Sequence, residues 1–397
     1  MPKLIRILNQ ISISVWLAYF TMTWGINTSN IYPYLIIFLI WLVTTYCLDK
    51  GWFKYFKRYL SILFIIVILD YILSLSLSNN NNYFRSVLIN IVLMYSWPLV
   101  LIFYSRNLSL VKWPIVFTLC ATTISAIYTG IGNYIIPEAS RELADQGEHK
   151  AKLLSEIRSL NIGGYGFVFY IVFLVMPLFL VFRNKGRGRL GISLCLLVLL
   201  FCILMTSYFT GIVIAFAMIL FIMLKERSLL RLAFKVLFLI GIVFLIKDPI
   251  LHLLLDFGES IDSAAIVRHA TEFIEDKGDE NIRFVLFGNA IKNWVDSPFW
   301  GMLFSGKKMY PSDHSAVLGY FEAYGLFGIF YILLLKEIYN ITYRTISSPV
   351  IKNYYLLYYS LFLFFLLVDT FTSPIPVSIF FIGPILFLIT DKNLRKI

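Results

Sequence analysis

The sequence is poor in charge, in cysteine and in histidine, and each shortage excludes a class of protein. Charged residues make up 14% of the 397 residues, whereas soluble chains carry about 25%, so a soluble globular protein is excluded. All four cysteines lie in long apolar segments, which excludes a framework of external disulfides and a cysteine-based metal site. The four histidines have no metal-ligand spacing and the acidic residues form no Asp-x-Asp cluster. We therefore expect neither a metal nor a cofactor.

Long apolar runs are what the sequence has in abundance. A helix needs about 20 apolar residues to span a bilayer, and inside hydrocarbon each such run must be helical because no other partner exists for its backbone groups. The predicted fold is therefore all-α, a single polytopic membrane domain over residues 1–397. Twelve predicted spans are centred near Trp16, Ile40, Ile66, Met94, Ser125, Phe173, Val198, Ile214, Leu239, Tyr331, Leu363 and Phe381.

The net charge of +11 is distributed unevenly among the connections between these spans. With both termini in the cytoplasm, the cytoplasmic connections hold 22 basic and four acidic residues, whereas the other side holds 12 basic and 17 acidic residues. This is the pattern of the positive-inside rule, so we predict both termini in the cytoplasm. No nucleic-acid module accompanies the basic clusters, and the expected partner is the lipid bilayer.

Two long connections fall on the extracytoplasmic side, over residues 131–161 and 247–313. The second contains an expected polar helix over 262–277 and an amphipathic helix over 283–295, which rests either on the membrane surface or on the helix bundle. Its apolar face is formed at helical spacing by Phe284, Phe287, Ile291 and Trp294. Because the cytoplasmic connections are short, we place the chemistry on the extracytoplasmic side.

Two residues of the late external connection are suited to chemistry on a phosphate ester. Arg283 carries a permanently charged planar fork of donors that matches phosphate. His314 titrates near neutral pH and can accept a proton from a sugar hydroxyl. The structural alternatives are an interfacial arginine that anchors a surface helix, and a histidine in the N-terminal region of the tenth span, capped by Ser312 or Asp313.

The order of motifs in this region resembles that of the O-antigen polymerase and ligase family, the Wzy-type and WaaL-type membrane glycosyltransferases. That family has an arginine before an amphipathic helix, then a Pro-x-x-Gly-x-Gly loop, then His-Ser or His-Asn, and then Glu-x-Gly-x-x-Gly. The matching residues here are Arg283, Pro298, Gly301, His314, Glu322, Gly325 and Gly328, with Gly306 as the displaced second loop glycine. One departure is that many relatives have an arginine after the seventh span, where this chain has Ser207-Tyr208.

The resemblance implies a metal-independent glycosyltransferase that polymerises polyprenyl-pyrophosphate-linked repeat units into O-antigen or a similar surface polysaccharide. It implies Arg283 at the pyrophosphate and His314 at the acceptor hydroxyl, while Glu322 either orients one of them or pairs structurally. A second phosphate-binding arginine must come from elsewhere. The candidates for it are Arg141, Arg158, Arg268 and Arg85. Further candidates for substrate contact are Tyr208, Trp294, Trp300 and Tyr324.

The same resemblance implies the cytoplasmic (inner) membrane as location, with the active site facing the periplasm or the cell exterior. It also implies a chain-length regulator and a flippase as partner proteins. Three other functions stay open: a ligase that transfers polysaccharide to lipid A core, a flippase or transporter of lipid-linked oligosaccharide, and a purely structural membrane protein. Asp70 lies within a span, where an ionisable group needs a partner that the sequence does not identify.

Overall fold

The structure, a computed structural model of the chain, is all-helical. It describes residues 2–23, 32–76, 95–136, 139–143, 159–184, 189–206, 208–224, 247–260, 280–304, 315–369 and 374–394, together with Ser155, Ile157, Val267 and Thr271. Helix accounts for 87% of it, and no strand occurs among these residues. The expected helical class is confirmed, because apolar runs of this length have no other way to pair their backbone groups.

Within the described ranges, seven helical segments are long and apolar enough to cross a membrane. They are α1 (Pro2–Thr21), α3 (Lys57–Ser76), α6 (Lys112–Ile135), α9 (Tyr165–Asn184), α16 to α17 (Ala316–Thr345), α18 (Pro349–Val368) and the C-terminal segment of α19 (Ile375–Val377), η4 (Ser378–Ile382) and α20 (Gly383–Leu394). Shorter apolar helices are α2 (Tyr32–Leu48), α10 (Arg189–Met205) and α11 (Phe209–Leu224), and α5 (Trp97–Arg106) is shorter still. These helices are compatible with a multi-pass membrane protein. The predicted span around Leu239 lies outside the described residues.

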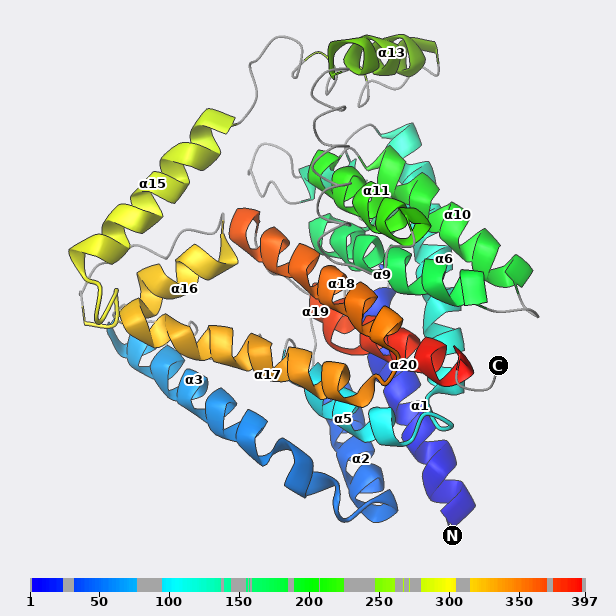
Figure 1. Cartoon of the computed structure of the whole chain (residues 1–397), viewed down its shortest axis with the longest axis vertical. Coiled ribbons are helices and arrows are strands. Elements are labelled where there is room, and N and C mark those ends of the chain that lie inside the picture. The colour runs from blue at the N-terminus through cyan, green and yellow to red at the C-terminus, as the bar shows by residue number, and fades with distance from the viewer. Residues whose placement is uncertain are drawn as a thin grey trace.

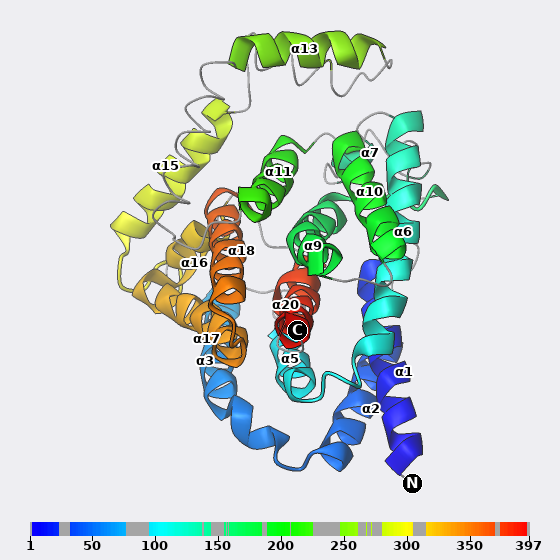
Figure 2. The same ribbon diagram turned by 45° about the vertical axis from the view of Figure 1, so that its right-hand side comes forward.

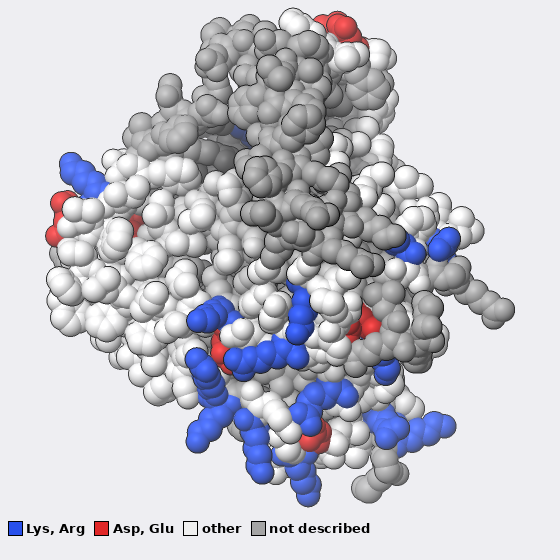
Figure 3. All heavy atoms as spheres, viewed as in Figure 1, with Lys and Arg blue, Asp and Glu red and all other residues white. Residues whose placement is uncertain are grey.

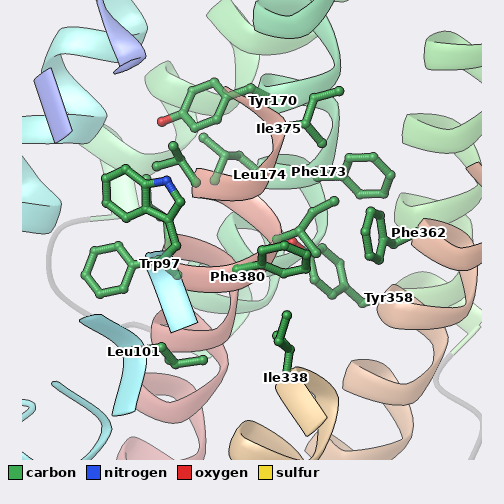
Figure 4. Packing of buried hydrophobic residues seen from close by; sticks show 14 of the residues in the cluster. Trp97, Leu101, Tyr170, Phe173, Leu174, Ile338, Tyr358, Phe362, Ile375 and Phe380 are labelled. Carbon is green, nitrogen blue, oxygen red and sulfur yellow. The ribbon is translucent and has the colours of Figure 1, made fainter. Parts of the chain in front are cut away.

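Two segments, α9 and the C-terminal helix, occupy the centre of the bundle, with α1, α2, α6 and α10 on one side and α3, α17 and α18 on the other (Figures 1 and 2). Both are apolar on all sides, as expected for helices buried by protein. Aromatic side chains fill the space between them and α18, as Figure 4 shows. The ring of Phe362 lies 5.9 Å from that of Phe173 and 5.7 Å from that of Phe380. This core holds the surrounding helix ends in place.

Lysine and arginine side chains gather at one end of the molecule, the lower end in Figure 3, which we call the basic end. There the chain runs from α2 through the 3₁₀ turn η1 (Trp52–Phe56) into α3, from α5 into α6 and from α17 into α18. Arg58 lies 3.6 Å from Glu337, and the Arg106 guanidinium lies 3.8 Å from the ring centre of Tyr55. The carboxylate of Asp391 accepts hydrogen bonds from two backbone N–H groups just before α18.

The tenth predicted span is broken into two helices, which corrects the expectation of one helix centred on Tyr331. Helix α16 (Ala316–Tyr324) ends at the 3₁₀ turn η3 (Gly325–Gly328), and α17 (Ile329–Thr345) continues in another direction (Figure 1). Gly325 has φ +57°, a conformation that ends a helix and favours glycine. The cap of α16 is Ser315, whose hydroxyl accepts from the Leu318 N–H at 3.2 Å. The cap expected at Ser312 or Asp313 is therefore three or two residues too early.

The expected amphipathic helix is present as α15 (Glu280–Asp296), and it packs on α16. Ala290 is buried, and Asn293 and Trp294 contact α16. Ile291 and Val295 are 46% and 63% exposed. The contact face therefore keeps Trp294 of the predicted stripe but leaves Ile291 exposed and includes Asn293, whose polar contact an apolar count ignores. A further helix, α13 (Lys247–Ser260), also belongs to this connection, whereas the polar helix expected over 262–277 lies almost entirely outside the described residues.

Candidate functional site

The two glycine-containing motifs of the late external region interlock through their backbones. The turn after α15 places the Pro298 carbonyl where it accepts from the Leu326 N–H at 2.8 Å. One residue beyond Gly301, the Met302 N–H donates to the carbonyls of Glu322 and Ala323 at 3.1 and 3.0 Å. These bonds join the Pro298–Gly301 turn to the end of α16.

Glycine is required on both sides of this contact. Gly301 and Gly325 both have φ +57°, a backbone conformation that residues with a side chain rarely adopt. A Cβ on Gly301 would lie 2.5 Å from the Glu322 carbonyl oxygen, and a Cβ on Gly325 would lie 2.5 Å from the Phe299 carbonyl carbon. Gly328 is also close-packed, because its Cβ would lie 2.9 Å from the Tyr320 carbonyl oxygen. All three glycines therefore lie where a neighbouring backbone leaves no room for a side chain.

Glu322 connects this interlocked unit to α15. Its side chain is buried at 3% exposure, and its Oε1 accepts from the Asn293 amide at 2.7 Å. Asn293 lies on the helix that also contains Arg283. The side chain of Arg283 lies outside what the structure describes. Glu322 therefore bonds to the helix that contains Arg283, and Asn293 is a partner of Glu322 that the sequence did not single out.

The aromatic candidates have different surroundings. Trp294 packs on Phe321 with ring centres 5.3 Å apart. Trp300 lies 5.5 Å from Phe327 and stays 51% exposed, so part of its ring can contact a sugar. Tyr324 is buried, stacks on a neighbouring tyrosine and directs its hydroxyl at Asp70. These contacts give Tyr324 a packing partner in place of an open ring face.

Arg141 and Tyr208 come together although they are far apart in the sequence. Arg141 lies on the short helix α7 (Ala139–Glu142), and the Tyr208 hydroxyl donates to the carbonyl of Ser140 at 3.0 Å. Burial raises the pKa of Tyr208, the positive charge of Arg141 lowers it by a smaller amount, and the negative charge of Asp369 raises it. The hydroxyl thus remains a protonated donor at neutral pH, beside one cation and one anion.

Helix α7 is held by a buried network of hydrogen bonds. The Asn133 amide donates to the Ser140 hydroxyl at 2.7 Å, and its oxygen accepts from the Ser140 N–H at 3.0 Å. The Ser140 hydroxyl in turn donates to the Gly163 carbonyl at 2.6 Å, and the Gly163 N–H donates to Thr129 at 2.8 Å. Because the network is fully buried, it fixes the position of the Arg141 backbone, which directly follows Ser140. Only Asn133, a polar residue near the end of an apolar run, signals this network in the sequence.

The start of α16 lies at the same end of the bundle. Its Ala316 N–H donates to the Asp369 carbonyl at 3.2 Å, and the Ser315 hydroxyl donates to the Leu366 carbonyl at 3.3 Å. Asp369, at the end of α18, is also the residue whose charge acts on Tyr208. Asp369 therefore links the start of α16 to Tyr208, because its carbonyl accepts from Ala316 and its charge acts on Tyr208. We call this region, formed by α7, Tyr208, the end of α18 and the start of α16, the far end.

Four of the sequence candidates lie outside the described residues, namely His314, Arg85, Arg158 and Arg268. Among the described residues, no group of three or more His, Cys, Asp or Glu side chains lies close enough together to hold a metal. No protein-family model matches the chain, and no curated protein matches its sequence.

Proposed function

We propose that this protein is a membrane glycosyltransferase that polymerises polyprenyl-pyrophosphate-linked oligosaccharide repeat units into O-antigen or a similar surface polysaccharide. The interlocking of the motif segments is the observation that supports it. The Pro298–Gly301 turn, the Glu322–Gly325 segment and the helix of Arg283 form one packed unit. Residues that share a motif only by coincidence would have no reason to contact one another.

The proposal includes twelve spans, both termini in the cytoplasm and insertion in the cytoplasmic (inner) membrane. The gathering of basic side chains at the basic end supports this orientation. In the proposed orientation the far end, with Arg141 and Tyr208, faces the extracytoplasmic side, where we expect lipid-linked donor and acceptor to meet. The expected protein partners are a chain-length regulator and a flippase.

In the proposed reaction the acceptor hydroxyl loses its proton to His314, and its oxygen bonds to the anomeric carbon of the donor sugar. The bond from that carbon to the pyrophosphate oxygen breaks, so polyprenyl pyrophosphate leaves. Arg283 stabilises the charge that develops on the leaving group, and Arg141 is the best placed second cation among the described residues, because it lies on a short helix fixed by a buried network. Glu322 acts through Asn293, and Trp300 offers an exposed ring to the sugar.

The direct test is Arg283→Ala, compared with Lys292→Ala on the same helix. Loss of a charged contact to a developing anion costs about 100-fold or more in rate, so Arg283→Ala should abolish chain elongation while insertion stays normal. Lys292 is exposed, and its variant should leave the polymer ladder unchanged on a gel of surface polysaccharide. A normal ladder with Arg283→Ala would refute the role of this residue.

A purified-protein assay separates polymerase from ligase. With lipid-linked repeat units as the only substrate, a polymerase makes a ladder, whereas a ligase makes none until lipid A core is added. We expect the ladder without core acceptor.

Transport of lipid-linked oligosaccharide is a second candidate, and one observation favours it. Transporters use discontinuous helices and intramembrane carboxylates, and here α16 and α17 are separated by a 3₁₀ turn with the buried Asp70 beside it. Vesicles containing the protein and a lipid-linked oligosaccharide decide between the two. Translocation without any polymer would establish the transporter, and polymer formation would exclude a purely transporting role.

A further inference from the structure

Asp70 is a buried carboxylate whose partners only the structure reveals. It lies on α3, within a segment apolar enough to cross a membrane, and is 2% exposed. The hydroxyl of Tyr324 donates to its Oδ1. The hydroxyl of Tyr331 lies 3.1 Å from both carboxylate oxygens. A carboxylate in apolar surroundings is costly unless such donors compensate it.

The two tyrosines lie on opposite sides of the helix break. Tyr324 is the last residue of α16, and Tyr331 is in the first turn of α17. Their rings stack with centres 5.4 Å apart, and Tyr320 of α16 stacks on Tyr331 at 3.9 Å. The Tyr320 hydroxyl also lies 3.3 Å from that of Tyr95. One carboxylate of α3 therefore holds both arms of the broken helix.

The arm formed by α16 carries the interlocked unit. Glu322 is two residues before Tyr324, and Gly325, which contacts the Phe299–Gly301 backbone, is the next residue after it. A rotation of α16 relative to α17 would displace Glu322, the turn and the helix of Arg283 together. Nothing in the contact between Glu322 and Asn293 itself prevents such a rotation, because both partners would move as one body.

We propose that Asp70 is a positioning residue for the transfer reaction: through Tyr324 and Tyr331 it sets the angle between α16 and α17 and thereby places Glu322 and α15. The assignment of the reaction rests on the proposed function, whereas the clamp between α3 and the broken helix is a property of the fold. A displacement of about 1 Å in a transfer site costs about 100-fold in rate, so release of one arm should reduce polymer formation by that order.

The variants that test the clamp differ in what they keep. Asp70→Asn retains an oxygen that accepts from the tyrosine hydroxyls, so it should keep the angle and most of the activity. Asp70→Leu and Tyr324→Phe each release α16 from Asp70, while the hydrogen bonds of its first residues to α18 stay in place. Tyr359→Phe is the matched control, because it removes an equally buried tyrosine hydrogen bond, 2.7 Å to the Leu335 carbonyl, away from the break.

The angle is measured directly by the distance between two spin labels in the full-length protein. Gly288 of α15 has open space where a side chain would start. Thr345 is exposed at the C-terminal end of α17, where a rotation gives the largest displacement. Cysteines are introduced at these two positions after the exposed Cys47 and Cys120 are replaced by serine.

We expect Asp70→Leu and Tyr324→Phe to shift or broaden the distance distribution, and Asp70→Asn and Tyr359→Phe to leave it unchanged. If Asp70→Leu does not insert, Tyr324→Phe decides. An unchanged distribution in the releasing variants overturns the clamp. Loss of activity in Asp70→Asn without a change in distance also overturns it, because the charge itself would then be required. The distances test the clamp even if no polymerase activity is found, so failure of the clamp and failure of the proposed function are distinguishable.

Discussion

The contact between Gly301 and Gly325 makes a quantitative prediction about Gly301→Ala. At φ +57° an alanine costs about 1–2 kcal/mol. Its Cβ would lie 2.5 Å from the Glu322 carbonyl oxygen and 2.5 Å from the Gly325 nitrogen. Both atoms belong to the backbone, so they cannot move aside as a flexible side chain would. The turn must therefore separate from the end of α16.

Separation removes the hydrogen bonds that join the turn to α16. The Met302 N–H loses the carbonyls of Glu322 and Ala323, and the Leu326 N–H loses that of Pro298. At about 0.5–1.5 kcal/mol for each donor, together with the left-handed backbone strain, the turn should be destabilised by about 2–5 kcal/mol. Since 1.4 kcal/mol is tenfold in an equilibrium constant, local opening should increase by about 30-fold or more.

Hydrogen exchange of the backbone amides measures this opening in the purified protein. The peptide that contains Met302 should exchange about 30-fold faster or more in Gly301→Ala. Gly288→Ala is the matched control, because its Cβ meets no atom within 4 Å and it lies inside α15. Alanine there should stabilise the helix by about 1 kcal/mol. Equal exchange rates in the two variants would refute the close contact between the motifs.

Three further predictions concern the hydrogen bonds around the site. Asn293→Ala removes the donor to the buried Glu322 carboxylate and should lower the free energy of unfolding by about 1–3 kcal/mol; an equal loss when Glu322 is already leucine would show that the two do not interact. Because burial raises the pKa of Tyr208, its neutral form contributes stability that is lost as the pH rises above the ordinary value of about 10. Tyr208→Phe should therefore lose less of its Tm than the parent protein between pH 9 and about 11, and identical losses would contradict that shift. Asn133→Leu should expose the backbone around Ser140 to faster exchange, because both of its contacts to that residue disappear; unchanged exchange would show that the network does not hold α7.

Much of the helical structure is predictable because helix formation depends on the composition and periodicity of short segments of the sequence. The apolar runs predict α1, α3, α6 and α9 at their observed places, since hydrocarbon allows only helices. The amphipathic pattern also predicts the existence of α15. Its contact face was predicted less well, because the periodic pattern counts apolar residues, and the decisive contact is the polar one between Asn293 and Glu322.

The break between α16 and α17 was not predictable from the sequence. Gly325 stands in an apolar run, where a glycine is tolerated inside a helix at a modest cost. It ends the helix here because it adopts φ +57°, and the backbone of the turn at Phe299 packs where a Cβ would be. A contact with another segment, and no property of the run itself, decides the end of α16.

The sequence by itself determined the helical, apolar class of this protein and the order of its motif residues, because hydropathy and helical period are properties of short segments. Only the tertiary structure decided which of those residues meet. Asp70 accepts hydrogen bonds from Tyr324 and Tyr331, and Tyr208 donates one to Ser140, across more than 60 residues of chain in each case. Such pairs depend on how whole helices pack, and the free energy of that packing is spread over the entire core.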